Sequence, residues 1–322
     1  MARVTIIVPI YNVEKYIERC VRSLFAQTLD DIEFIFIDDC TPDRSMVLLE
    51  SEIEKKRPHF EVMNWKVRTV RMPTNSGLPA VRRHGIRLAT GDYIFHCDSD
   101  DWIAEDMLSE MWKAADKENL DIVVCDYYEI SDSDKTHKTG GKTTNIKEYF
   151  HNVFLARYSW ALWNKLIKRS LYTNPNFIFP SNNMGEDMAA TLQLLGNCKS
   201  MGYIPRAFYY YYSNPSSITQ TKTDDQVISN MLQWKENVKI LEKCYKDSTD
   251  KHIKGSITYL KYRVKNYLLP IMYKRRYRRL WKETFPEINL QVYICPWIDY
   301  RSKLYFLLTY IGVLPLAFTK RK

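Results

Sequence analysis

The sequence predicts an α/β protein with a doubly wound, mainly parallel sheet over the first 126 residues and a helical, basic region at the C-terminal end. Two observations support this fold class. Short runs rich in β-branched and aromatic residues alternate with stretches long enough for helices, and these runs are mostly apolar without an alternation of polar and apolar residues. Strands that helices cover on both faces have this uniform apolar character.

Five runs in this first part are expected to be strands. They are residues 4–8 (VTIIV), 33–37 (EFIFI), 67–71 (VRTVR), 93–97 (YIFHC) and 121–125 (DIVVC). The first helix is expected within 13–27, where apolar residues recur at a spacing of three or four, the period of a helix with one buried face. Alternation of strand and helix predicts the parallel sheet.

The pattern changes after residue 126. A polar stretch, 131–145 (SDSDKTHKTGGKTTN), is expected to be a loop or a boundary. The elements expected after it are a helix at 146–158, an aromatic patch at 158–163, a helix at about 185–196, a tyrosine-rich strand at 208–212 and helices from about 225. We therefore divide the chain into residues 1–220, with halves 1–126 and about 146–220, and a C-terminal region 221–322.

Positive charge is concentrated in the C-terminal region. The net charge is +9, but residues 251–322 alone hold sixteen Lys and Arg against three Asp and Glu. Such a segment suggests an anionic partner, either a membrane surface or a nucleic acid. The basic run 273–280 (YKRRYRRL) lacks an RNA-recognition motif, so we expect no nucleic-acid partner.

An apolar segment near the C-terminus indicates where a membrane could be contacted. Residues 304–318 (LYFLLTYIGVLPLAF) are 15 in number and are bracketed by Arg301, Lys303 and the basic residues 320–322. Spanning a bilayer takes about 20 apolar residues, so an interfacial anchor within 301–322 is expected, gripping anionic lipid. The competing interpretation is a C-terminal helix packed into the core.

Cysteine usage indicates the compartment. The seven cysteines are scattered and form no C-x-x-C pair, which fits thiols kept reduced in a cytoplasm. A strand pattern begins at once at the N-terminus, with no signal-peptide pattern before it. We therefore expect a cytoplasmic protein, held peripherally on the inner face of the cell membrane.

Polar residues collect where three of the expected strands end. Residues 9–12 (PIYN) follow the first strand, Asp38 and Asp39 follow the second, and residues 98–101 (DSDD) follow the fourth. In open α/β sheets ligands bind outside the carboxyl ends of the strands. These three segments therefore predict a binding site at one rim of the sheet.

The chemistry of this rim points to a cation and a phosphate ligand. The first turn contains no glycine, so the G-x-G-x-x-G cradle of dinucleotide folds is missing, and no phosphate-binding P-loop occurs. A hard divalent cation held by Asp98 and Asp100, with phosphate oxygens completing its coordination, would offset the charge of such a ligand. Alternatively, Asp100 or Asp101 caps a helix starting near Ala104; we expect that role for Asp101.

These segments together resemble the family-2 glycosyltransferases with a GT-A fold, of the type that builds bacterial surface polysaccharides. The resemblance covers residues 4 to about 220. Its pieces are VTIIVPIYNVEKYIERCVRSLFAQTLDDIEFIFIDDCTPD, NSGLPAVRRHGI, ATGDYIFHCDSDDW, WNKLIKRSL and GEDMAATLQLL. Their order and spacing make the resemblance specific.

The resemblance implies positions for a nucleotide-sugar donor and a metal. The positions implied to contact the donor are Pro9, Tyr11, Glu14, Asp39, Arg82, Asp98 and Ser99. Asp39 would bond the base, commonly uracil, and Arg82 the diphosphate, unless Arg82 is only a charge on a helix surface. Asp100, with Asp98, would hold Mg²⁺ or Mn²⁺.

Two departures from the family pattern affect the donor site. Residues 40–43 read Cys-Thr-Pro-Asp where the family usually has Gly/Ser-Ser/Thr-x-Asp, which leaves the nucleotide less certain. Residues 81–83 read Val-Arg-Arg in place of Ala-Arg-Asn and add a positive charge near the donor.

A second acidic pair, Glu186–Asp187, matches the position of the family's catalytic base. An inverting transfer needs a base for the acceptor hydroxyl and a stabiliser for the departing diphosphate; the cation would supply the second. We expect Asp187 to be the base and Glu186 to orient the acceptor or share the role. Alternatively, both acids merely favour a helix N-terminus. Trp160 and Trp163 could stack on a sugar or belong to the core.

The expected function is an inverting, metal-dependent transfer of a hexose or N-acetylhexosamine from a nucleotide sugar, in the first instance a UDP-sugar. The expected acceptor is a saccharide, lipid-linked, in cell-surface polysaccharide synthesis. Three alternatives stay open: a phosphatase or phosphotransferase using Asp-x-Asp, a nucleotidyltransferase, and a non-catalytic sugar- or lipid-binding module. The first would place its motif after the first strand, and the second normally has a glycine-rich loop there.

Overall fold

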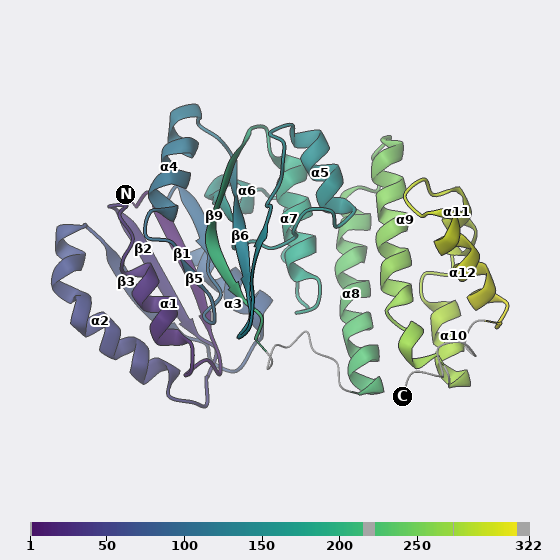
Figure 1. Ribbon diagram of the computed structural model, residues 1–322, viewed down its shortest axis with the longest axis horizontal. Coiled ribbons are helices and arrows are strands. Elements are labelled where there is room, and N and C mark those ends of the chain that lie inside the picture. The colour runs from purple at the N-terminus through teal and green to yellow at the C-terminus, as the bar shows by residue number, and fades with distance from the viewer. Residues whose placement is uncertain (1, 215–222, 273, 314–322) are drawn as a thin grey trace.

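The computed structural model describes residues 2–214, 223–272 and 274–313. Its centre is a single nine-stranded mixed sheet with helices on both faces, and the C-terminal helices extend the molecule to one side (Figure 1). The strand order is β3-β2-β1-β4-β8-β6-β9-β5, and β7 pairs with β6.

The first half of the sheet is parallel, as predicted. Its strands are β1 (Val4–Ile10), β2 (Ile32–Asp38), β3 (Lys66–Arg71) and β4 (Tyr93–His96). The intervening helices are α1 (Ile17–Leu24), α2 (Ser45–Val62) and α3 (Leu78–Leu88). Only β3 departs from the uniform burial expected, because it is the edge strand and its residues are exposed or half-buried.

The second half of the sheet is mixed. Its elements are β5 (Trp102–Ile103), α4 (Met107–Glu118), β6 (Ile122–Ile130), β7 (Lys135–Lys138), α5 (Ile146–Phe154), β8 (Lys165–Lys168), α6 (Arg169–Tyr172), α7 (Glu186–Asn197) and β9 (Met201–Tyr212). Strand β8 inserts between β4 and β6 and is antiparallel to both. The polar stretch 131–145 is not simply a loop, because β7 within it forms a hairpin with β6.

Helices follow as predicted from about residue 225. They are α8 (Asp224–Cys244), α9 (Lys251–Asn266), the 3₁₀ helix η1 (Leu269–Ile271), α10 (Arg275–Glu283), α11 (Ile288–Ile294) and α12 (Tyr300–Tyr310). The start of α8 is fixed by a capping box between Thr223 and Gln226. Of the apolar segment 304–318, the last five residues lie outside the described part of the chain, as does Tyr273.

Two apolar clusters hold these layers together. One lies between the sheet and helices α1, α2 and α4, and the other lies on the opposite face under α3, α5 and α7. The second cluster continues through α8 and α9 to Trp281 and Phe306 at the C-terminal end. Within residues 2–214, 223–272 and 274–313, no helix is both long enough and apolar enough to cross a bilayer.

Candidate functional site

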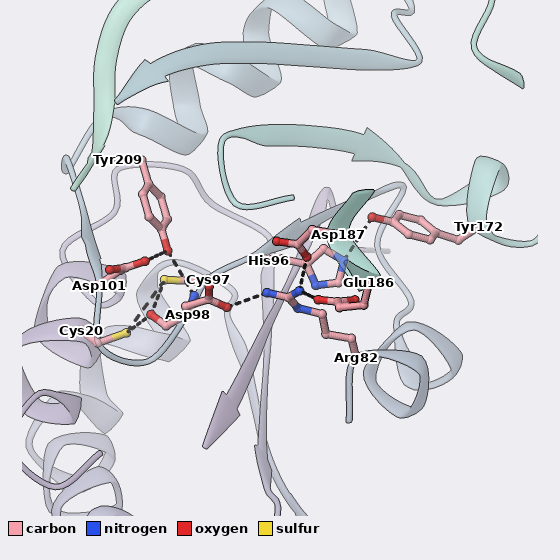
Figure 2. Close-up of polar contacts among 10 residues, drawn as sticks. All are labelled: Cys20, Arg82, His96, Cys97, Asp98, Asp101, Tyr172, Glu186, Asp187 and Tyr209. Carbon is pink, nitrogen blue, oxygen red and sulfur yellow. Dashed lines mark hydrogen bonds and ion pairs between the residues drawn. The ribbon is translucent and has the colours of Figure 1, made fainter. Parts of the chain in front are cut away.

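Arg82 is at the centre of an ionic cluster at the carboxyl rim of the sheet. Its Nη2 lies 2.7 Å from Oδ1 of Asp98, just past the end of β4, and its Nη1 contacts both Glu186 and Asp187 at the start of α7 (Figure 2). The Arg82 side chain is 3% exposed. Four residues that the sequence assigned to three separate motifs therefore meet around one guanidinium.

Asp39 fixes the start of α3, the helix that carries Arg82. The backbone amides of Ser76 and Gly77 donate to the two carboxylate oxygens of Asp39 at 2.7 and 2.9 Å. Helix α3 begins at the next residue, and Arg82 follows one turn later on its buried face. Asp39, expected to bond a nucleobase, thus also ties the second strand end to α3.

The start of α7 is set by Gly185. This residue has φ +79°, a left-handed conformation that glycine adopts without strain. The ring of Trp234 on α8 lies 2.3 Å from the place where a Cβ would be, so a larger residue would collide with an aromatic ring. The tight turn places Glu186 and Asp187 in the first turn of α7, facing Arg82.

The cluster carries more negative than positive charge. Burial lowers the pKa of Arg82, but Asp187 and Asp98 raise it by more, so this guanidinium stays charged. Burial raises the pKa of Asp98 to about 6, against the opposing effect of Arg82 and with the support of Asp187 and Asp100. An added cation would relieve this mutual repulsion among the carboxylates.

Asp101 is not the helix cap that the sequence suggested. It is fully buried, and its carboxylate accepts hydrogen bonds from the hydroxyl of Tyr209 at 2.6 Å and from the backbone amide of Tyr212 at 2.7 Å. Helix α4 begins six residues after it, at Met107, and its N-cap is Asp106. Burial raises the pKa of Asp101 well above its usual range, and the nearby Asp100 and Asp98 add to this.

Asp98 and Asp100 could supply part of a metal site. Asp98 uses one oxygen on Arg82, and Oδ2 of Asp100 accepts from Asn214 at 3.0 Å, while Ser99 between them is buried. Among the described residues no group of three or more His, Cys, Asp or Glu side chains could hold a metal by itself. Two carboxylates fit a hard cation whose other ligands come from water or phosphate oxygens.

The first strand end carries the other residues expected to contact a donor. Pro9 lies within β1, Tyr11 is 48% exposed, and Oε2 of Glu14 accepts from the amide of Arg44 at 3.1 Å. Cys40, at the departure from the family pattern, has φ +57° and donates its thiol to the carbonyl of Met72 at 3.1 Å. These residues and Asp39 border the rim on the side of β1 and β2.

Two buried residues next to the cluster, His96 and Tyr172, were not assigned a role from the sequence. His96 Nε2 lies 3.1 Å from the hydroxyl of Tyr172, and its Nδ1 has no partner among the described residues. Burial, together with the positive charge of Arg82, lowers the pKa of His96 to about 3, so the ring is neutral. A histidine inside an otherwise apolar strand run was the signal available for this buried pair.

A buried lysine, Lys165, holds together residues 159–164, the segment directly before β8. Lys165 Nζ donates to the carbonyls of Ser159 and Ala161 and to Oδ1 of Asn164, at 2.7 to 3.1 Å. Burial lowers its pKa to about 7. The lysine stood in the WNKL motif without an assigned role.

The two tryptophans of the aromatic patch have different environments. Trp163 is 6% exposed and stacks on Tyr209 and Tyr211 with ring centroids 4.3 and 5.4 Å away, so it belongs to the core. Trp160 is half-buried beside Trp234, and its carbonyl accepts from Thr191, one turn beyond Asp187 on α7. Of the pair, Trp160 stays a candidate for contact with a sugar.

The rim can therefore bind an anion through a cation and can hold a carboxylate base close by. Asp187 has a side chain 30% exposed, whereas that of Glu186 is 6% exposed. A carboxylate that solvent reaches can accept a proton from an incoming hydroxyl group, and the buried one is placed to hold Arg82.

Comparisons with known proteins show what the chain is similar to. The sequence profile of Glycosyl transferase family 2 matches residues 5–190. The glycosyltransferase EpsJ of Bacillus subtilis (strain 168) is 32% identical over 225 residues, which is 67% of this chain and 63% of EpsJ. The match thus spans less than two thirds of that relative's length.

Solved structures of low sequence identity support the fold. S. aureus TarS 1-349 in complex with UDP superposes with a TM-score of 0.72 at 18% identity, covering 98% of this chain and 89% of the TarS 1-349 chain. The mannosyltransferase PcManGT from Pyrobaculum calidifontis, in complex with GDP-Man and Mn²⁺, gives 0.56 at 16% identity, covering 97% and 87%.

Proposed function

The chain belongs to glycosyl transferase family 2, and from this premise we propose that it transfers a sugar from a nucleotide-sugar donor to a saccharide acceptor with inversion at the anomeric carbon. The observation that carries the proposal is the cluster around Arg82. It brings the Asp-x-Asp segment, where a donor diphosphate would bind, next to the acidic pair that would supply the base. The proposed catalytic unit is residues 1–220.

Asp187 is the proposed catalytic base. Its carboxylate would take the proton from the acceptor hydroxyl as that oxygen attacks the anomeric carbon on the face opposite the diphosphate. The bond between the anomeric carbon and the diphosphate oxygen breaks in the same displacement, and the nucleoside diphosphate departs with the electron pair. Glu186 is buried and forms an ion pair with Arg82; it would position the guanidinium and the turn that carries Asp187.

Asp98 and Asp100 are the residues proposed to hold Mn²⁺ or Mg²⁺. The cation would offset the charge of the diphosphate and stabilise it as it leaves. Two carboxylates would be sufficient, since such a cation takes one or two carboxylates plus substrate phosphates. The Mn²⁺ in the PcManGT complex provides parallel support.

Arg82 has a proposed second role when the donor binds. A diphosphate would compete with Asp98 for one face of the guanidinium, because phosphate oxygens match its fork of N–H donors. The three carboxylates that surround Arg82 keep it charged and ordered until then.

We propose that the donor is a UDP-sugar carrying a hexose or N-acetylhexosamine. The UDP in the TarS complex supports this nucleotide, and the GDP-Man in the PcManGT complex makes a GDP-sugar the first competitor to test. Asp39 would accept from the base while its oxygens also receive the amides of Ser76 and Gly77. Pro9, Tyr11 and Glu14 would border the nucleoside on its other side.

We propose that the acceptor is a lipid-linked saccharide used in cell-surface polysaccharide synthesis on the cytoplasmic face of the membrane. Trp160 is half-buried, and its carbonyl accepts from Thr191, which lies one turn beyond Asp187 on α7; its ring would therefore be near enough to contact an acceptor ring. The basic charge of residues 251–322 supports a position close to anionic lipid.

Donor turnover tests this proposal. With Mn²⁺ present, one member of a panel of UDP- and GDP-sugars should release its nucleoside diphosphate slowly without acceptor and faster with a saccharide acceptor. Chelation of the cation and Asp100→Asn should each abolish release. Lack of turnover of every nucleotide sugar, with or without saccharide acceptors, would contradict the proposal. Hydrolysis of phosphomonoesters instead would favour the phosphotransferase alternative.

A further inference from the structure

Exposed apolar side chains gather at the C-terminal end of the molecule. Fourteen large hydrophobic side chains are exposed in the described part of the chain, and ten of them lie between residues 290 and 313. Figure 1 shows α10, α11 and α12 together at the end of the molecule remote from α2. Isolated exposed apolar residues are ordinary, but a concentration of this kind marks an interaction surface.

The two last helices are apolar on the side that faces away from the protein. On α12 the buried residues are Phe306 and Thr309, while Tyr300, Leu304 and Leu307 are exposed together with Ile311 just after it. Their spacing of four, three and four residues places these four side chains in one stripe, opposite the buried face. A helix on a protein surface normally presents polar residues there.

Helix α11 likewise has apolar residues on its exposed side as well as on its buried side. Ile288 and Val292 are buried, whereas Leu290 and Ile294, two residues further on in each case, are 81% and 83% exposed. We use the name apolar platform for the exposed residues Leu290, Ile294, Tyr300, Leu304, Leu307 and Ile311. It begins earlier than the segment 301–322 that the sequence suggested.

Beneath the platform, the buried side of α12 packs against aromatic side chains of the neighbouring helices. The ring of Phe306 lies 4.9 Å from Trp281 on α10, 5.8 Å from Tyr262 on α9 and 6.3 Å from Tyr293 on α11. The inward residues of α12 thus pack in the core, as one interpretation of the sequence expected, while the residues of its outward stripe are exposed.

Cations border the platform. Nζ of Lys282 on α10 lies 4.9 Å from the centre of the Tyr310 ring, so the basic helix runs beside α12. Arg301 and Lys303 lie on α12 itself, exposed and half-buried respectively. Across residues 251–322 there are sixteen Lys and Arg against three Asp and Glu.

We propose that the apolar platform docks on the surface of an anionic lipid bilayer, with α11 and α12 lying in the plane of the interface. Leucine and isoleucine side chains would enter the boundary between headgroups and acyl chains, and tyrosines would lie at headgroup level. Lys282, Arg301 and Lys303 would contact anionic headgroups. This inference deepens the proposed position close to anionic lipid by naming the surface that makes the contact, and it does not depend on which reaction the rim performs.

The charge distribution favours a bilayer over a second copy of the chain. A twofold contact through the platform would bring Lys282, Arg301 and Lys303 of one copy close to the same cations of the other. Juxtaposed like charges weaken such a contact, whereas an anionic surface is attracted to them.

Flotation of the full chain with lipid vesicles, without donor or acceptor, tests the proposal. Binding is expected to phosphatidylcholine vesicles containing anionic phosphatidylglycerol, and it should weaken at high salt. Leu304→Ser with Leu307→Ser should lower the partition coefficient about tenfold or more. Lys282→Gln with Arg301→Gln and Lys303→Gln should lower it about a hundredfold on anionic vesicles, because each cation near the surface adds about a factor of five.

Matched substitutions of exposed residues elsewhere serve as controls. Val62→Ser with Leu232→Ser, and Lys56→Gln with Lys66→Gln and Lys117→Gln, should leave vesicle binding unchanged. Circular dichroism should show every variant folded, since the altered side chains are exposed or half-buried. Equal binding by the platform and control variants would overturn the proposal. So would a dimer in light scattering that Leu304→Ser with Leu307→Ser dissociates, since the platform would then be an interface between copies.

Discussion

Arg82 and Asp98 form an ion pair of 2.7 Å between α3 and the end of β4, while the same guanidinium contacts Glu186 and Asp187 on α7. One buried positive charge therefore connects the expected metal motif with the expected base. Because three carboxylates face it, the site keeps an excess of negative charge that suits a divalent cation.

Asp187→Asn should lower kcat by about 10²–10⁴-fold and leave the donor KM nearly unchanged, since a base acts on the acceptor during the chemical step. Steady-state kinetics with the donor found by screening measure both constants. Glu236→Gln, an exposed acid on α8, is the matched control and should behave as wild type. An unchanged kcat in Asp187→Asn would remove Asp187 from the role of base.

Arg82→Met should lower the free energy of unfolding by about 3 kcal/mol or more at neutral pH, because three carboxylates would lose their shared counter-charge. Urea unfolding followed by circular dichroism measures this loss. Arg83→Met on the exposed side of α3 should change it by less than about 0.5 kcal/mol. Equal losses in the two variants would show that the ionic cluster contributes nothing specific.

Tyr209→Phe should destabilise the protein by about 1–3 kcal/mol, because the buried Asp101 carboxylate and the Asp98 amide would both lose their contact with the hydroxyl. Thermal unfolding and urea unfolding give the change. Tyr210→Phe keeps the stacked ring beside Trp102 and is expected to be close to neutral. A neutral Tyr209→Phe would mean that Asp101 does not depend on this hydrogen bond.

Gly185→Ala should reduce both stability and kcat, because an added Cβ meets the Trp234 ring and displaces the turn that carries Glu186 and Asp187. Gly312→Ala is a matched control with φ +88° and nothing within 4 Å of the new Cβ. It should cost only the backbone strain of about 1 kcal/mol and leave kcat unchanged. Comparable effects of the two substitutions on kcat would rule out the proposed collision.

The stability contributed by Glu52 should disappear in acid. The Arg22 guanidinium holds the pKa of Glu52 at about 2, despite the opposing effect of burial, and Lys55 assists. The unfolded chain therefore binds this proton first, so the contribution is complete above about pH 4.5 and is lost as pH falls towards 2. The difference in unfolding free energy between wild type and Glu52→Gln, about 2 kcal/mol at neutral pH, should shrink over that range. A constant difference would contradict this account.

Much of the fold could be predicted because strand and helix periodicities are local properties. The runs at 4–8 and 33–37 and the helical pattern near 185–196 are read directly from neighbouring residues, and each lies in the expected element. Strand β8 escaped because its four residues carry no distinctive period and its place between β4 and β6 depends on long-range pairing.

The candidate site could be predicted in its parts but not in its connections. Asp98, Asp100, Glu186 and Asp187 stand in recognisable motifs, whereas the role of Arg82 depends on α3, β4 and α7 meeting in space. Asp101 illustrates the limit, since aspartates after strands often cap helices but this one turns inward to β9. The contacts of His96 and Lys165 could not be predicted, because they depend on the burial of both side chains in the folded protein.

The sequence by itself determined the α/β alternation, the strand ends where acidic groups collect, and the basic charge of the C-terminal region, because these follow from residue type and spacing along the chain. Only the tertiary structure decided which charges meet and which apolar faces stay uncovered. Those outcomes depend on distances between segments far apart in sequence, as between Arg82 and Glu186, and on which side of α12 the core occupies.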